Sequence, residues 1–92
     1  MNILLCCLSY REYTGSEIYF YELSTALHSA GHNVSIFSPF VDSPLQDRTK
    51  DINFPNKEEI KKETYDMVLF SHGKIIWEYI KEVKTNRLIN II

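Results

Sequence analysis

The sequence is poor in the residues that define several classes of small protein. It has two cysteines in 92 residues, too few for the disulfide framework of many small secreted domains. These two, Cys6 and Cys7, are adjacent, so on a strand they point to opposite faces and do not pair with each other. They also do not form a CxxC redox or metal motif. We therefore predict two buried, reduced thiols and a cytoplasmic protein.

An excess of basic residues is also missing. Ten Lys and Arg stand against twelve Asp and Glu, and the resulting net charge of −2 gives no support for a nucleic-acid partner. The first apolar run, residues 3–8, is short and follows no basic segment, so we expect neither a signal peptide nor a transmembrane segment. A chain of this length can bury one modest core, which predicts a single domain over residues 1–92.

Glycine is scarce and lies in none of the common nucleotide-binding motifs. The three glycines do not form a GxGxxG or a GxxxxGK[ST] motif, so neither a dinucleotide site nor a P-loop is indicated. No cluster of residues has metal-ligand spacing. We accordingly expect no cofactor and no metal.

Apolar runs alternate with amphipathic segments along the chain. Strands are predicted over 3–8, 34–37, 67–70 and 88–92, with a short edge strand over 51–54. Helices are predicted over 16–30 and 57–63, and a third is marked by Ile75, Ile76, Tyr79, Ile80 and Val83. The first helix is expected to bury Tyr19, Phe20, Leu23, Ala26, Leu27 and Ala30.

Residues at the expected helix ends suit those positions. Thr14 and Glu17 form a capping-box pattern at the start of the first helix, and Gly31 follows its end as a left-handed stop. Asn56 is expected to cap the second helix.

This alternation predicts an α/β fold with right-handed crossovers and helices on both faces of a doubly wound, mostly parallel sheet. The expected strand order is 3-2-1-4-5, a partial Rossmann-like domain whose switch point lies between strands 1 and 4. The loops over 9–16 and 71–74 meet at that point, where ligands of such folds bind.

Residues of these two loops are the candidate site. Backbone N–H groups of Gly15 and Ser16 could bind a phosphate at the helix start, or Gly15 could simply allow the turn. Glu17 is either a structural cap or a ligand-binding residue. His72 is the candidate catalytic residue, against the alternative of a structural histidine. Lys74 opposes the helix dipole, which an anion nearby would offset.

Two apolar residues fall outside the predicted buried faces. Ile18 lies opposite Leu23 and Leu27 on the first helix, and Trp77 lies far from the apolar stripe of the last helix. We predict that Ile18 and Trp77 contact a partner, either a second copy in a homo-oligomer or a separate domain.

The opening of the chain resembles a known enzyme family. The resemblance is carried by Met1-Asn2-Ile3-Leu4-Leu5, Thr14-Gly15-Ser16-Glu17, Tyr21-Glu22-Leu23-Ser24-Thr25-Ala26-Leu27, Ala30-Gly31-His32-Asn33-Val34 and Ser38-Pro39. These segments are similar to the start of the retaining, nucleotide-sugar-dependent glycosyltransferases of GT-B architecture (family four, group 1 type). The segment from Asp66 to Gly73 is similar to a later strand of that family that ends in a histidine.

The resemblance implies a truncated N-terminal domain, the acceptor side of a two-domain transferase. Gly15, Ser16 and Glu17 would form the turn beside the donor diphosphate, and His72 would lie near the transferred sugar. Helix-end N–H groups and basic side chains stabilise the leaving diphosphate in such enzymes, so no metal is needed. The implied ligands are a nucleotide-sugar and an acceptor sugar. Because the donor-binding domain and its glutamate pair are not found here, we expect the chain to be inactive without a C-terminal domain partner.

The sequence departs from the family pattern at two positions. Thr14 replaces the first glycine of the turn, and Phe70-Ser71-His72 stands where the family often has His-x-His.

Two other functions are alternatives to the transferase. The segment from Ser9 to Ser16 loosely resembles the phosphate loop of flavodoxins, which indicates a flavodoxin-like module that binds a phosphate-bearing ligand. The apolar residues outside the buried faces indicate a non-catalytic interaction domain.

Overall fold

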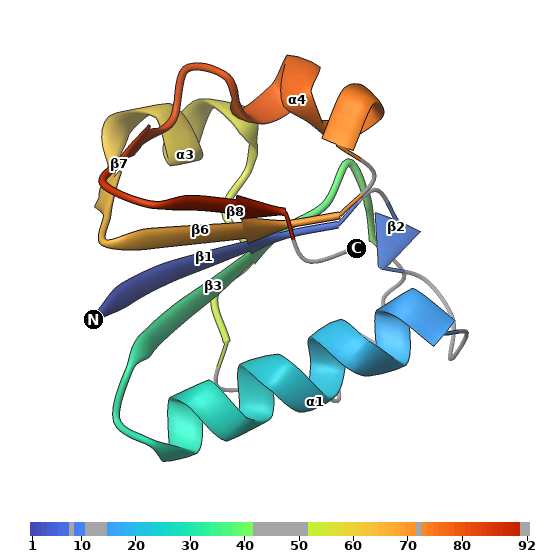
Figure 1. The fold of residues 1–92 in the computed structure, drawn as a ribbon, viewed down its shortest axis with the longest axis vertical. Coiled ribbons are helices and arrows are strands. Elements are labelled where there is room, and N and C mark those ends of the chain that lie inside the picture. The colour runs from blue at the N-terminus through green and yellow to red at the C-terminus, as the bar shows by residue number, and fades with distance from the viewer. Residues whose placement is uncertain (8, 11–14, 42–51, 72, 91–92) are drawn as a thin grey trace.

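A parallel β-sheet forms the centre of the molecule (Figure 1). The computed structural model of the chain describes residues 1–7, 9–10, 15–41, 52–71 and 73–90. The main sheet consists of β1 (Asn2–Cys6), β3 (Asn33–Phe37), β6 (Met67–Phe70) and β8 (Leu88–Asn90), in the spatial order β3-β1-β6-β8. Every neighbouring pair is parallel. The predicted α/β class with a mostly parallel sheet is confirmed.

Helices cover both faces of this sheet. Figure 1 shows α1 (Gly15–Ser29) along one face and both α3 (Lys57–Lys62) and α4 (Gly73–Ile80) along the other. Parallel neighbours need a crossover to return the chain to the same end of the sheet, and helices supply these crossovers here. The prediction of helices on both faces is confirmed.

Two short ladders extend the sheet at its ends. At the carboxyl end, β2 (Ser9–Tyr10) pairs with β4 (Phe40–Val41), the segments that follow β1 and β3. At the amino end, β5 (Thr64–Tyr65) pairs with β7 (Lys84–Thr85), the segments that precede β6 and β8. Both ladders are parallel, so each prolongs the direction of the strands beside it.

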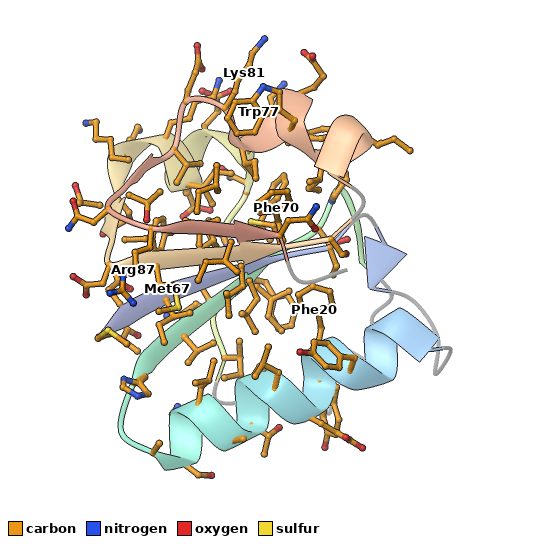
Figure 2. The ribbon with its side chains drawn as sticks, in the orientation of Figure 1. Phe20, Met67, Phe70, Trp77, Lys81 and Arg87 are labelled. Atoms are coloured by element: carbon orange, nitrogen blue, oxygen red, sulfur yellow. The ribbon has the colours of Figure 1, made fainter. Side chains whose placement is uncertain are left out.

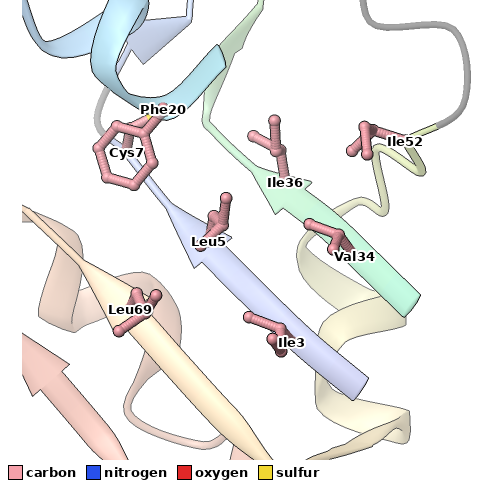
Figure 3. Packing of buried hydrophobic residues seen from close by; sticks show 8 residues of the cluster. All are labelled: Ile3, Leu5, Cys7, Phe20, Val34, Ile36, Ile52 and Leu69. Carbon is pink, nitrogen blue, oxygen red and sulfur yellow. The ribbon is translucent and has the colours of Figure 1, made fainter. Parts of the chain in front are cut away.

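Buried apolar side chains form one cluster on each face of the sheet. The cluster under α1 contains Ile3, Leu5, Cys7, Phe20, Val34, Ile36, Ile52 and Leu69 (Figure 3). The cluster under α3 and α4 contains Leu4, Cys6, Phe37, Ile60, Tyr65, Val68, Ile76 and Ile80. Successive residues of β1 alternate between these clusters, as side chains on a strand must. A strand covered on both faces needs an unbroken apolar run. Burial of each large apolar side chain contributes about 1.5–3 kcal/mol to the stability of the fold.

Two predicted helix ends are confirmed by their hydrogen bonds. Gly31 has a φ of 93°, its N–H donates to His28 O at 3.0 Å, and the N–H of His32 donates to Leu27 O at 3.2 Å. This is the Schellman arrangement that closes a helix through a left-handed residue. At α3, the N–H of Glu59 donates to Asn56 Oδ1 at 2.8 Å, and the N–H of Asn56 donates to Glu59 Oε1 at 2.9 Å. The pair forms a capping box.

The predicted strand order 3-2-1-4-5 differs from the observed sheet, in which the described residues form strands 2, 1, 4 and 5 but not the predicted strand 3. The predicted edge strand over 51–54 contributes only an isolated parallel bridge between Asn53 and Ser35, and Asn53 O accepts from the N–H of Ile36 at 2.8 Å. Asp51 lies outside the described residues. Pro55 has no N–H to donate, so pairing cannot continue beyond this bridge.

The buried faces of α1 and α4 also differ from the prediction. Tyr19, Ala26 and Ala30 are exposed, whereas Ser24 is fully buried. The row facing the sheet runs through Phe20, Ser24 and Leu27, and Ser24 tolerates burial because its hydroxyl donates to Tyr21 O at 2.9 Å. The ring of Phe20 points from α1 toward the sheet in Figure 2.

On α4, Ile76 and Ile80 are buried in the core, whereas Ile75, one of the residues that mark this helix in the sequence, is 55% exposed.

Replacing Gly31 by alanine should lower the free energy of unfolding by about 1–2 kcal/mol. The Cβ would meet no atom within 4 Å, so the loss comes from the left-handed backbone alone. Gly31→Asn is the matched control and should lose less, because asparagine tolerates this conformation better. Urea denaturation followed by circular dichroism measures both variants. Equal losses for the two would contradict the backbone explanation.

Candidate functional site

The carboxyl end of the sheet is the candidate site that topology defines. The connection from β1 passes through α1 to β3, and the connection from β6 passes through α4 to β8. β1 and β6 are neighbours, so the two crossovers leave the same point in opposite directions and on opposite faces. In open parallel sheets, ligands bind outside the strand ends at such a divergence.

Two helices begin at this end of the sheet. Figure 1 shows the first turns of α1 and α4 on the side of the molecule where β1 and β6 end. A helix start presents unpaired N–H groups and a partial positive charge, which favour an anion. The first turn of α4 contains no acidic residue. The electrostatics of the α4 start therefore suit a negatively charged group, whereas the first turn of α1 contains Glu17.

Backbone hydrogen bonds join the strand ends behind this point. The N–H of Cys7 donates to Phe37 O at 3.1 Å, and the N–H of Ser71 donates to Cys6 O at 3.2 Å. Both Cys7 and Ser71 are buried. The first bond extends β1 by one residue against β3, and the second extends β6 by one residue against β1.

The two thiols are buried, as predicted, and are poor nucleophiles. Burial raises the pKa of the Cys6 thiol well above its usual value, and the neighbouring Cys7 adds to the shift. Neither Cys6 nor Cys7 is in a disulfide within the described part of the chain, and the two lie in opposite clusters of the core. Since the thiolate is the reactive form, neither residue suits nucleophilic catalysis.

The structure places part of the predicted site. Gly15 begins α1, with Ser16 and Glu17 in its first turn, and Gly73 begins α4 with Lys74 next. The side chains of Ser16, Glu17 and Lys74 are outside the described part of the chain.

Among the other predicted site residues, the structure describes the side chain of Trp77 but not those of Thr14, Ile18 or His72. Thr14 and His72 lie outside the described residues, so the predicted Thr14–Glu17 capping box and the role of His72 stay predictions. The side chain of Ile18 is likewise not described, whereas Trp77 is 42% exposed and projects from the outer side of α4 (Figure 2).

A second concave region lies at the amino end of the sheet, where no sequence motif predicts a site. This pocket has a volume of about 580 Å³ and is lined by Asn2, Asn33, Ser35, Asn53, Phe54, Pro55, Glu59, Lys62, Glu63 and Tyr65. These residues come from β1, β3, α3, β5 and the segment that precedes α3. They are scattered over the sequence, and no motif marks them.

The residues that the structure describes, 1–7, 9–10, 15–41, 52–71 and 73–90, hold neither a metal site nor a membrane-spanning helix. Within them, no group of three or more His, Cys, Asp or Glu side chains is placed to hold a metal ion. No helix in this part of the chain has the length and apolar character needed to cross a membrane.

Comparison of the chain with known protein families, with curated proteins and with solved structures gives no match.

Stability should fall at alkaline pH. Burial, with smaller contributions from Glu63, Cys6 and Glu59, raises the pKa of Tyr65 from 10.0 to about 12, and the pKa of Cys6 is raised above 9.0. The unfolded chain releases these protons at lower pH, so these two groups leave the free energy of unfolding unchanged below about pH 9 and lower it above that pH.

Urea denaturation at a series of pH values measures this effect. Tyr65→Phe should abolish the part of the fall between pH 10.0 and about 12, a loss on the order of 1–2 kcal/mol. A variant with the same pH dependence as the natural chain would contradict this assignment.

Proposed function

We propose that the chain is the N-terminal, acceptor-side domain of a retaining glycosyltransferase of GT-B type. The single observation that carries this proposal is the divergence of α1 and α4 from the ends of neighbouring strands. Along the chain, the Thr14-Gly15-Ser16-Glu17 and Ser71-His72-Gly73 segments, on which the sequence resemblance rests, lead into these two helices. Sequence and topology thus point to the same end of the sheet.

The proposed roles follow from what sugar transfer requires. A retaining transfer leaves a nucleoside diphosphate, so the developing negative charge needs fixed donors. The N–H groups of Gly15 and Ser16, in the first turn of α1, supply donors that cost no reorganisation. Glu17 caps the helix or contacts the acceptor. His72 contacts the transferred sugar and acts as the catalytic residue of this half.

The proposal requires a second, donor-binding domain in addition to these residues. The 92 residues contain no pair of glutamates with the spacing typical of the donor domain. A nucleotide-sugar held only by one wall of a cleft is neither oriented nor protected from water, both of which transfer requires. We therefore expect the chain alone to be inactive.

The first test is binding of UDP, followed by the amide resonances of the chain. Shifts are expected at Gly15, Ser16 and Gly73, because a diphosphate between the two helix starts would contact their N–H groups. Ser16→Pro removes one N–H in a turn that tolerates proline, and should weaken binding by about tenfold. Ser29→Ala, at the other end of α1, is the control and should bind as before. UDP shifts that leave both helix starts unchanged would count against the site.

The second test is nucleotide-sugar turnover. The chain alone should neither transfer nor hydrolyse sugar, and activity should need a donor-binding domain added in trans. In that combined assay, His72→Ala should reduce turnover by about 100-fold or more, whereas the control His28→Ala at the far end of α1 should not. Turnover by the isolated chain would overturn the claim that the donor domain is required.

The exposed indole of Trp77 favours a second candidate function, a non-catalytic interaction domain. Trp77 is 42% exposed on α4, and large aromatic side chains are frequent anchors at protein interfaces. In the self-associating version of this function, sedimentation velocity at rising concentration shows a dimer for the natural chain and a monomer for Trp77→Ser. Ile75→Ser, also exposed on α4, is the matched control. A strict monomer at every concentration would remove the self-associating version.

A further inference from the structure

The pocket at the amino end of the sheet is separate from the candidate glycosyltransferase site. It lies beside the first residues of β1 and β3, Asn2 and Asn33, whereas α1 and α4 begin at the opposite ends of the strands. Its volume of about 580 Å³ falls within the range of pockets that bind small molecules. A ligand here would therefore be recognised independently of the proposed transferase function.

Two buried residues that carry hydroxyl groups, Ser35 and Tyr65, line this pocket. Ser35 is 6% exposed and Tyr65 is 2% exposed. Among the described residues, neither side chain has a hydrogen-bond partner, yet every fully enclosed side-chain nitrogen or oxygen in this part of the chain has one. The two hydroxyls therefore open into the pocket, where each can donate to and accept from a ligand.

Asparagine side chains supply further polar groups in fixed positions. Asn33 Nδ2 donates to Asn2 Oδ1 at 3.2 Å, and Asn2 Nδ2 donates to Thr64 O at 2.9 Å. This chain of bonds holds the Asn33 amide in place and leaves its Oδ1 available as an acceptor. Asn53 is anchored by its backbone bridge to Ser35.

The charge of the lining disfavours an anion. Glu59 and Glu63 carry two negative charges against the one positive charge of Lys62, so the lining has a net charge of −1. Glu59 Oε1 is engaged by the N–H of Asn56, which leaves its second oxygen free to accept from a ligand hydroxyl. Phe54 and Pro55 add apolar surface at the same pocket.

Hydroxyls, amides and carboxylates beside an apolar surface suit a ring that carries several hydroxyl groups and no charge. Each ligand hydroxyl can donate to a carboxylate or amide oxygen and accept from Ser35, Tyr65 or an amide. We propose that this pocket binds a neutral polyhydroxylated ring of monosaccharide size, with Ser35, Tyr65, Asn33 and Asn53 as the recognising residues.

Titration of the intact chain with D-glucose, followed by backbone and asparagine side-chain resonances, tests the proposal. We expect saturable shifts at Asn33, Asn53 and Tyr65, with the resonances of Gly15 and Gly73 unchanged. myo-Inositol, a ring with hydroxyl groups but no aldehyde, should produce shifts at the same residues. Glucose 6-phosphate should bind more weakly than glucose, and tighter binding would overturn the preference for an uncharged ligand.

Matched variants distinguish glucose binding in this pocket from non-specific binding elsewhere on the protein. Tyr65→Phe and Ser35→Ala each remove one hydroxyl and should weaken glucose binding by about five- to tenfold. Their controls are Tyr79→Phe and Ser24→Ala, which remove hydroxyls outside the pocket and should leave binding unchanged. Asn53→Ala changes an exposed side chain, so it tests the pocket without altering the core.

Absence of saturable shifts, or shifts that persist at full strength in both Tyr65→Phe and Asn53→Ala, would overturn the proposal. Because glucose and UDP are expected to shift different resonances, failure here is distinguishable from failure of the glycosyltransferase assignment.

Discussion

The rest of the structure depends on the complete burial of β1, which has a strand on each side and an apolar cluster on each face. Its backbone pairs with β3 on one side and β6 on the other, and Leu4, Leu5 and Cys6 are fully buried. A strand in this position cannot satisfy its N–H and C=O groups with water, so both neighbouring strands must be present. Its side chains alternate between two faces, so apolar cover is needed on both. The positions of α1 on one face and of α3 and α4 on the other meet this requirement.

The candidate site at the carboxyl end is a consequence of that arrangement. Parallel strands end together, and helices that cover opposite faces must leave neighbouring strands in opposite directions. The starts of α1 and α4 therefore lie on opposite faces at the end of the sheet where β1 and β6 end. The same burial makes the cysteines unreactive, because desolvation keeps the Cys6 thiol protonated. Chemistry at this end accordingly has to come from the loop residues and the helix starts.

The amino end of the sheet has a different character because its first residues are polar. Asn2 and Asn33 are paired in register and open a region where the apolar cover from α3 and α4 stops. Ser35 continues this polar surface inward along β3, and Tyr65 brings a hydroxyl to it from β5. The domain thus has two ends with different chemistry: helix starts at one, and amide, hydroxyl and carboxylate groups at the other.

Much of the fold could be predicted because the signals are local. The apolar runs at β1, β3 and β6, the Gly31 stop and the Asn56 cap each depend on a few adjacent residues, and all are confirmed. The predicted edge strand was wrong because a run such as 51–54 shows propensity but not whether a neighbour can pair with it beyond Pro55. The location of the candidate site followed from topology, whereas the pocket at the amino end had no signal in the sequence.

The sequence by itself determined which segments become helices and strands, since periodicity and end residues act over a few positions. Only the tertiary structure decided which face of each element is buried. It turned Ser24 inward in place of Ala26, left Ile75 exposed beside buried Ile76, and assembled the pocket from five separate segments. The physical reason is that burial depends on the rotation of a helix against its sheet and on which distant segments meet. Both are set by packing of the whole chain.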